Sequence, residues 1–200
     1  MLKDMGHQIK VAVMLLMVLS ILTGILYPLA ITAFAQVFFP WQANGSILER
    51  DGRPIGSLLI GQSFDSPDYF WGRPSATQPF PYNGEASQGS NSGPSNVAFL
   101  AMVHQRVLHL KSLDPLNPLL IPVDLVTASA SGLDADISPA AALYQVHRIA
   151  LARHMLDSDL HRLVLRQIKN RWLGVLGEPC INVLQLNMAL DDFNARAHHG

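Results

Sequence analysis

The sequence predicts an α+β protein with one N-terminal transmembrane helix followed by a small mixed α/β domain. No Asp, Glu, Lys or Arg occurs between Lys10 and Glu49, and most of this gap is apolar. The chain beyond it is long enough to bury a core of its own, and helix and strand patterns follow one another there. These observations divide the chain into a stub (1–10), a span with an interfacial end (11–39) and a folded domain (40–200).

The composition narrows the range of functions. Charged residues make up 14% of the 200 residues, against about 25% in a typical soluble domain. The formal net charge is −1, so the chain supplies no basic field and nucleic acid is not an expected partner. A single cysteine, Cys180, excludes an intrachain disulfide and a cysteine-rich zinc site.

The apolar run from Val11 to Phe34 is long enough to cross a lipid bilayer, because about 20 apolar residues span the hydrocarbon. Pro28 is expected to kink the helix, and an aromatic cluster (Phe38, Phe39, Trp41) marks the point where the chain leaves the lipid. The alternative is a cleaved signal peptide, since Ala33-Phe34-Ala35 has the small-x-small pattern. The run is far longer than a signal core of about 7–15 residues, so we expect a retained span.

The lysines indicate the orientation of the span. Lys3 and Lys10 precede it, and positive charges stay on the cytoplasmic side. We therefore expect a single-pass protein of the cell inner membrane with a cytoplasmic stub and an extracytoplasmic domain. One helix face carries small or hydroxylated side chains that permit close helix packing, namely Ser20, Thr23, Gly24 and Tyr27.

The domain shows local start and stop signals for several elements. The expected elements are a strand at 56–60, a helix at 97–110 capped by Ser95, a strand at 121–127, a helix starting at Ser138-Pro139, a helix at 157–170, and a strand at 180–183 followed by a helix. Residues 64–96 are dominated by Gly, Pro, Ser and Asn but hold many aromatic residues. Disordered segments are poor in aromatics, so this segment is expected to be an ordered, irregular loop.

No catalytic or metal-binding constellation is expected. The Gly/Ser run at 88–93 has no lysine within reach, unlike a phosphate-binding P-loop. His147, His154 and His161 are taken as surface histidines, and Asp124 as a carboxylate on an exposed strand face. From the residues alone, a membrane-anchored extracytoplasmic enzyme and a self-associating anchor protein stay open as alternatives.

Several long blocks, in order, carry a family resemblance. They are LTGILYPL (22–29), QANGS (42–46), GRPSAT (72–77), SQGSNSGPSN (87–96), PVDLVTASASGLDADISPAAALYQVHRIA (122–150) and LGEPCINVLQLNMALD (176–191). In these blocks the chain resembles the C subunit of the Kdp-type potassium-transporting P-type ATPase. The resemblance implies a non-catalytic accessory subunit of a high-affinity potassium uptake pump, with ATP hydrolysis and phosphorylation in another subunit.

The implied partners are a P-type pump subunit, a channel-like potassium-selecting subunit and the lipid bilayer. Potassium would be transported by the complex and not bound by this chain. The aromatic loop is the preferred docking surface, with Tyr69, Phe70, Trp71, Arg73 and Tyr82 as the expected contacts.

The resemblance also implies a catalytic chaperone that promotes ATP use by the pump subunit. The candidate nucleotide contacts are Gln145, Ser87, Gly89 and Ser90. An extracytoplasmic domain cannot touch cytoplasmic ATP, so ATP is expected to act through the pump complex, with coupling through the membrane helices.

Overall fold

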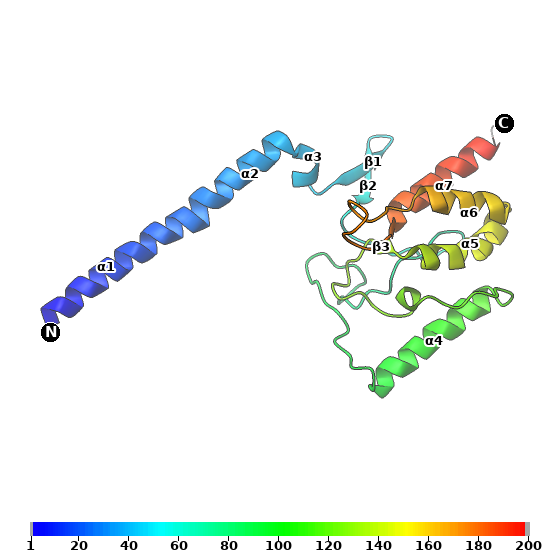
Figure 1. Ribbon diagram of the computed structural model, residues 1–200, viewed down its shortest axis with the longest axis horizontal. Helices are drawn as coiled ribbons and strands as arrows, with labels where there is room; N and C mark the ends of the chain where they lie inside the picture. The colour runs from blue at the N-terminus through cyan, green and yellow to red at the C-terminus, as the bar shows by residue number, and fades with distance from the viewer. Residues whose placement is uncertain (1, 199–200) are drawn as a thin grey trace. The chain divides into compact units, whose positions relative to one another are not determined.

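A computed structural model describes residues 2–198, which divide into two compact units, Met1–Ile47 and Leu48–Gly200. The first unit is a long helix followed by one short helical turn. The second is a mixed helix and strand domain with its own core. Each unit is described by itself, and the order of their elements can be followed by colour in Figure 1.

The first unit contains the predicted membrane span. Helices α1 (Leu2–Ile21) and α2 (Tyr27–Phe38) are joined by a π-helical turn, η1 (Leu22–Leu26). The stretch Met5–Phe38 is long and apolar enough to cross a membrane, and none of it is buried. This π turn, in which the Tyr27 amide donates to the Leu22 carbonyl, lies just before Pro28, where a kink was expected; the kink itself stays a prediction. A proline cannot donate to the preceding turn, and a π turn is one way in which a helix accommodates the change.

A short polar network closes the C-terminal end of this unit. The side-chain amides of Gln36 and Asn44 bond to each other at 3.1 and 3.3 Å. Asn44 also donates to the Pro40 carbonyl within α3 (Pro40–Ala43), at 2.6 Å. The Trp41 indole donates to the Ile47 carbonyl at 3.0 Å. The aromatic cluster therefore belongs to a defined turn.

The second unit begins with a hairpin and then runs through a long irregular segment. Strands β1 (Ile47–Arg50) and β2 (Arg53–Ser57) form a two-stranded sheet. The strand expected at 56–60 therefore lies earlier in the chain, and residues 58–60 form a turn. Residues 58–96 contain no helix or strand, as expected for 64–96.

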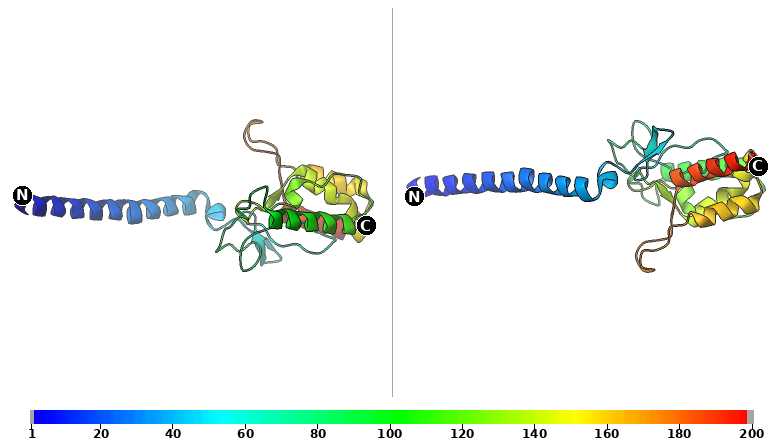
Figure 2. Two further views of the ribbon diagram at one scale, coloured as in Figure 1. Left: turned by 90° about the horizontal axis from the view of Figure 1, so that it is seen from below. Right: turned by 90° about the horizontal axis from the view of Figure 1, so that it is seen from above.

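Helices build the rest of the domain (Figure 2). Helix α4 (Val97–Leu113) is capped by Asn96, which accepts from the amides of Ala98 and Phe99, so the expectation of Ser95 as cap was wrong by one residue. The remaining elements are α5 (Pro139–Arg153), α6 (Asp157–Arg166) and α7 (Val183–His198), with β3 (Asp136–Ile137) antiparallel to β4 (Ile181–Asn182). The core lies among these elements and includes Phe70, Ile137, Ile149, Leu160, Ile181, Leu186 and Leu190.

The expected strand at 121–127 is wrong. Residues Val123–Leu125 form a 3-10 turn, η2, and Asp124 accepts the Ser138 amide at 2.8 Å. Asp124 therefore supports the start of α5 and is not a free carboxylate on a strand face. Pro122 has no N–H to donate to a neighbouring strand. The Thr127 amide donates within the same segment, to the Val123 carbonyl at 3.0 Å.

Candidate functional site

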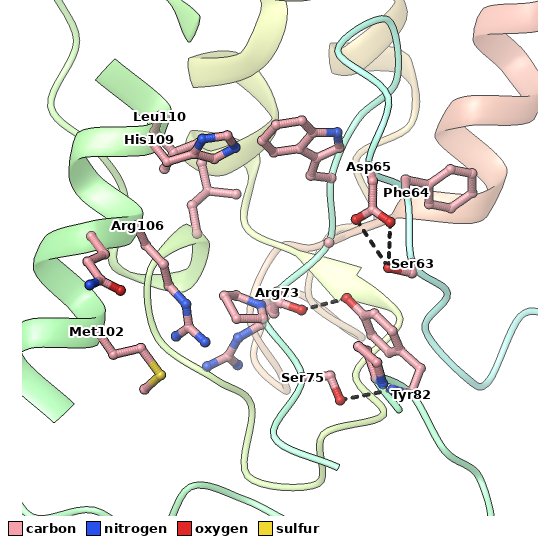
Figure 3. A pocket seen from close by; sticks show the side chains of 16 residues that line it. Ser63, Phe64, Asp65, Arg73, Ser75, Tyr82, Met102, Arg106, His109 and Leu110 are labelled. Atoms are coloured by element: carbon pink, nitrogen blue, oxygen red, sulfur yellow. Dashed lines mark hydrogen bonds between the residues drawn. The ribbon is translucent and has the colours of Figure 1, made fainter. Parts of the chain in front are cut away.

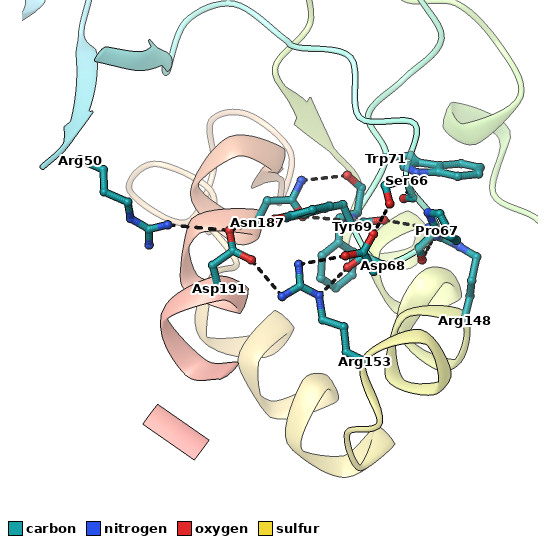
Figure 4. Close-up of polar contacts among 11 residues, drawn as sticks. Arg50, Ser66, Pro67, Asp68, Tyr69, Trp71, Arg148, Arg153, Asn187 and Asp191 are labelled. Atoms are coloured by element: carbon teal, nitrogen blue, oxygen red, sulfur yellow. Dashed lines mark hydrogen bonds and ion pairs between the residues drawn. The ribbon is translucent and has the colours of Figure 1, made fainter. Parts of the chain in front are cut away.

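Two buried side-chain amides, those of Asn187 and Gln145, hold the aromatic part of the irregular segment. Figure 4 shows the Asn187 contact. Asn187 of α7 accepts from the Phe70 amide at 2.9 Å and donates to the Phe70 carbonyl at 3.0 Å. Gln145 of α5 does the same at Trp71, at 2.8 and 3.1 Å. A primary amide has a donor and an acceptor side by side, so each side chain pairs with the backbone as a neighbouring strand would. The segment is fixed without belonging to a sheet.

Arg148 adds a second layer of contacts to this segment. Its guanidinium donates to the carbonyl of Pro67, to the Tyr69 carbonyl at 3.1 Å and to Gln145 at 2.8 Å. It also lies 4.3 Å from the centre of the Trp71 ring. Burial lowers the pKa of Arg148 to about 10, with partial compensation by Asp114 and Asp68. The charge is tolerated because carbonyl oxygens and an aromatic face surround it.

Arg153 performs a similar role one turn later. It donates to the Asp68 carbonyl at 2.7 Å and forms an ion pair with Asp191 at 2.9 Å. Its guanidinium stacks 4.5 Å from the Tyr69 ring, and the Tyr69 hydroxyl bonds Asp191 at 3.2 Å. Each of residues 67–71 is therefore anchored to α5, to α7 or to both.

The structure separates the predicted docking residues into core and partly exposed groups. The side chain of Phe70 is fully buried, so the structure corrects its assignment: it is a core anchor and presents no surface. Tyr69, Trp71, Arg73 and Tyr82 are partly exposed, and docking by these four stays a prediction. Arg73 pairs with Asp134 at 3.2 Å, and the Tyr82 hydroxyl donates to the Arg73 carbonyl at 2.5 Å.

A cleft of about 530 Å³ lies between α4 and residues 63–82 (Figure 3). His109 of α4 stacks on Trp71 with ring centres 5.7 Å apart. Arg106 and Arg73 both line the cleft, and Arg106 donates to the Val126 carbonyl at 2.9 Å. Burial lowers the pKa of Arg106. Guanidinium groups bind carboxylates and stack on aromatic rings, so the cleft is suited to an acidic or aromatic group.

The candidate nucleotide residues are held by different parts of the fold. Gln145 is only 1% exposed and its amide is bonded to Trp71. Ser87 donates to the Ser131 carbonyl at 3.0 Å, and Ser90 is exposed. A Cβ added at Gly89 would lie 2.6 Å from the Ala130 oxygen. This glycine therefore permits close contact between two backbone segments.

The predicted packing face of the span lies on exposed helix. Thr23 donates to the Leu19 carbonyl at 2.7 Å, which satisfies its hydroxyl within the helix. A Cβ added at Gly24 would meet nothing within 4 Å, and the Tyr27 side chain is 64% exposed. This face is open to contact with lipid or with another helix.

Sequence reasoning missed several residues that organise the site. Four residues that anchor residues 67–71 were not among the expected site residues, namely Arg148, Arg153, Asn187 and Asp191. Three of them lie in the blocks 122–150 and 176–191, but nothing in those blocks marked them as functional. The available signal was a polar residue inside an apolar helix pattern, as Asn187 is in VLQLNMAL. Within residues 2–198, no group of three or more His, Cys, Asp or Glu side chains is placed to hold a metal ion.

Comparison with known proteins identifies the family. The family model described as "K+-transporting ATPase, c chain" matches residues 9–192. The chain belongs to this family, KdpC. It is 57% identical over 180 residues to the potassium-transporting ATPase KdpC subunit of Herpetosiphon aurantiacus, covering 90% of this chain and 93% of that protein. It is 55% identical over 183 residues to the KdpC subunit of Dechloromonas aromatica, covering 92% and 96%.

The KdpC match includes both the apolar helix and the folded domain, since it runs from residue 9 to residue 192. A third relative, the KdpC subunit of Ralstonia nicotianae, is 54% identical over 187 residues, which cover 94% of this chain and 92% of that protein. The resemblance seen in the sequence blocks is thereby confirmed. The chain is an accessory subunit of a potassium pump, and its apolar helix makes it membrane-anchored.

Proposed function

We propose that this chain stabilises the assembly of an ATP-driven, high-affinity potassium uptake pump and promotes its use of ATP without itself being catalytic. The observation that carries this proposal is the KdpC family match, which extends over the span and the domain together. Relatives at 52–57% identity bear the name of the potassium-transporting ATPase KdpC subunit. The proposed location is the cell inner membrane.

The proposed partners are a P-type subunit that hydrolyses ATP and is phosphorylated, and a channel-like subunit that selects potassium. The face with Ser20, Thr23, Gly24 and Tyr27 is the proposed contact within the membrane, because small residues let two helices approach closely. Outside the membrane, the partly exposed residues Tyr69, Trp71, Arg73 and Tyr82 form the proposed docking surface. Potassium is transported by the complex and not held by this chain.

ATP acts through the pump complex in this proposal. Lys3 and Lys10 favour a cytoplasmic stub and an extracytoplasmic domain, which separates the domain from ATP. The buried, fully bonded amide of Gln145 also argues for a structural role. The effect on ATP use is therefore proposed to travel through the membrane helices as a coupling free energy.

Protease accessibility in sealed vesicles tests the orientation. Inside-out vesicles carrying the full chain should protect residues 40–200, whereas right-side-out vesicles should expose them. Cleavage of the domain only from the cytoplasmic side would reverse the proposed topology and return direct ATP contact to consideration.

Reconstitution of the complex tests the accessory role. With the full chain present, the assembled pump should show potassium-dependent ATPase activity and a lower apparent KM for ATP than without it. Gly24→Leu should reduce co-purification of the partner subunits, because a bulky side chain separates packed helices. Gly6→Leu, near the N-terminal end of the stretch Met5–Phe38 and before Lys10, is the matched control. Unchanged assembly and ATPase activity in the absence of the chain would reject the proposal.

A further inference from the structure

A projecting hairpin arm, residues 168–180, displays apolar side chains to solvent. The arm connects α6 to β4 and extends away from the helices of the domain in both views of Figure 2. Its base is closed by Lys169 and Cys180, whose backbones exchange hydrogen bonds at 2.8 and 3.1 Å. Near the tip, Trp172 and Leu176 exchange bonds at 2.8 and 3.0 Å. The arm is therefore an ordered ladder rather than a loose loop.

Its tip is more apolar and more exposed than folding alone explains. The exposed fractions are 68% for Trp172, 77% for Leu173, 76% for Val175 and 56% for Leu176. Burial of such side chains is favourable, and contiguous exposed apolar groups mark interaction sites.

The backbone of the turn adds a second, independent observation. Leu173 has φ +52° and Gly174 has φ +75°. Turns with two positive φ values favour Asn-Gly or Gly-Gly, and a leucine in this region is strained. The turn therefore carries an apolar side chain at its apex against the local preference of the backbone. Residues that conflict with the local backbone preference are expected at functional sites.

Charge and chain connectivity indicate what the tip contacts. Arg171 precedes the tip and Lys169 lies at the base of the arm; both are exposed, and Arg171 pairs with the exposed Glu178 at 2.7 Å. A tryptophan beside aliphatic groups with flanking cations suits the interfacial region of a bilayer. The N-terminal helix keeps the domain near a bilayer, because only the nine residues 39–47 separate Phe38, the end of the apolar stretch, from Leu48. Such a tether reaches at most about 35 Å when extended.

We propose that the arm inserts its tip into the headgroup and upper acyl region of the bilayer that the N-terminal helix spans. Trp172, Leu173, Val175 and Leu176 enter the lipid, and Lys169 and Arg171 contact headgroup phosphates. The domain then has a second attachment to the membrane besides its helix. This inference rests on membrane anchoring and does not depend on any role in ATP use.

Site-directed spin labelling of the full chain in phospholipid vesicles tests the insertion. Cys180 is the sole cysteine, so Cys180→Ser provides the background for Leu173→Cys and Val175→Cys. The accessibility of both labels to a water-soluble nickel relaxant should be lower, by a factor of about five or more, than that of a label at Leu120→Cys. Leu120 is 92% exposed elsewhere in the domain. Equal accessibility at 173, 175 and 120 would overturn the proposal.

Two further measurements separate lipid contact from contact with a partner protein and from a folding defect. Leu173→Asn should leave the unfolding midpoint unchanged or raised, because Asn accepts positive φ, while the label at 175 becomes severalfold more accessible to nickel. A label that is shielded only after partner subunits are added identifies a protein contact and also overturns lipid insertion. Because Val175→Cys avoids the strained position, a folding defect of Leu173→Cys leaves the test intact.

Discussion

Gln145 and Asn187 show how single side chains substitute for a missing strand. Each presents one donor and one acceptor to the backbone of a neighbouring residue, Trp71 and Phe70 respectively. Both amides are 1–2% exposed, so water cannot replace the bonds if a side chain is removed. An unpaired buried polar group costs about 1–3 kcal/mol. The aromatic segment therefore depends on two residues that are distant from it in sequence.

Replacing Gln145 with alanine should destabilise the domain by about 2–4 kcal/mol. The change leaves the Trp71 amide and carbonyl unpaired and removes an acceptor from Arg148. The measurement is the free energy of unfolding of the full chain, in denaturant. Gln105→Ala, on the exposed side of α4, is the control and should change stability by less than about 0.5 kcal/mol.

The Gln145→Ala variant also distinguishes a structural role of Gln145 from a role in nucleotide binding. A positioning role predicts lost stability at all ATP concentrations. A nucleotide contact instead predicts a normal unfolding midpoint with a raised apparent KM for ATP in the assembled pump. The second result would contradict the structural role of Gln145.

Tyr82 should make the domain sensitive to alkaline pH. Burial, with smaller contributions from Asp134 and Asp65, raises the pKa of Tyr82 to about 12. The neutral hydroxyl donates to the Arg73 carbonyl at 2.5 Å. Because the folded pKa lies above the unfolded value near 10, the stabilisation is complete below pH 10. It is lost as the pH rises from 10 toward 12.

Tyr82→Phe provides the comparison for this pH effect. The variant should lose about 1 kcal/mol at neutral pH, the value of one hydrogen bond. Between pH 10 and 12 its stability should fall less steeply than that of the parent chain. Absorbance at 295 nm follows the ionisation and chemical denaturation follows the stability. Parallel pH curves for the two proteins would exclude Tyr82 as the responsible group.

At the scale of elements, local signals and distant partners differ in how well the sequence predicts them. The starts of α5 and α6 follow from Ser138-Pro139 and Asp157, because capping and helix-dipole effects are local. The strand expected at 121–127 failed because a strand requires a partner, and Asp124 instead bonds the start of α5. The aromatic residues predicted that residues 64–96 are ordered, whereas the path of the backbone through this segment depends on contacts with Gln145 and Asn187.

The cap of α5 offers a test of a local signal in the folded chain. The Ser138 hydroxyl accepts from the Ala141 amide at 3.0 Å. Ser138→Ala should lower the free energy of unfolding by about 1 kcal/mol. Ser138→Asp should retain most of the stability, since a carboxylate accepts the same bond and suits a helix N-terminus. Equal losses in both variants would show that the site responds to volume and not to capping.

At the scale of the whole molecule, the two units differ in the environment that stabilises them. The first, Met1–Ile47, holds a helix with no buried side chain in its apolar stretch, so its stable environment is lipid or another helix. The second, Leu48–Gly200, has its own core and clamps its irregular segment internally. Folding of the domain should therefore not require the span, whereas assembly should.

Deleting Met1–Phe39 should separate these two properties. The remaining chain, 40–200, should be soluble and show a cooperative unfolding transition, because its core residues all lie beyond Leu48. It should fail to co-purify with the pump subunits, because the helix that packs in the membrane is gone. Circular dichroism and co-purification measure the two outcomes, and a chain with a foreign single-span helix in place of residues 11–38 is the control for anchoring alone. If the soluble fragment restores full potassium-dependent ATPase activity, assembly depends on the domain surface and the proposed role of the span is refuted.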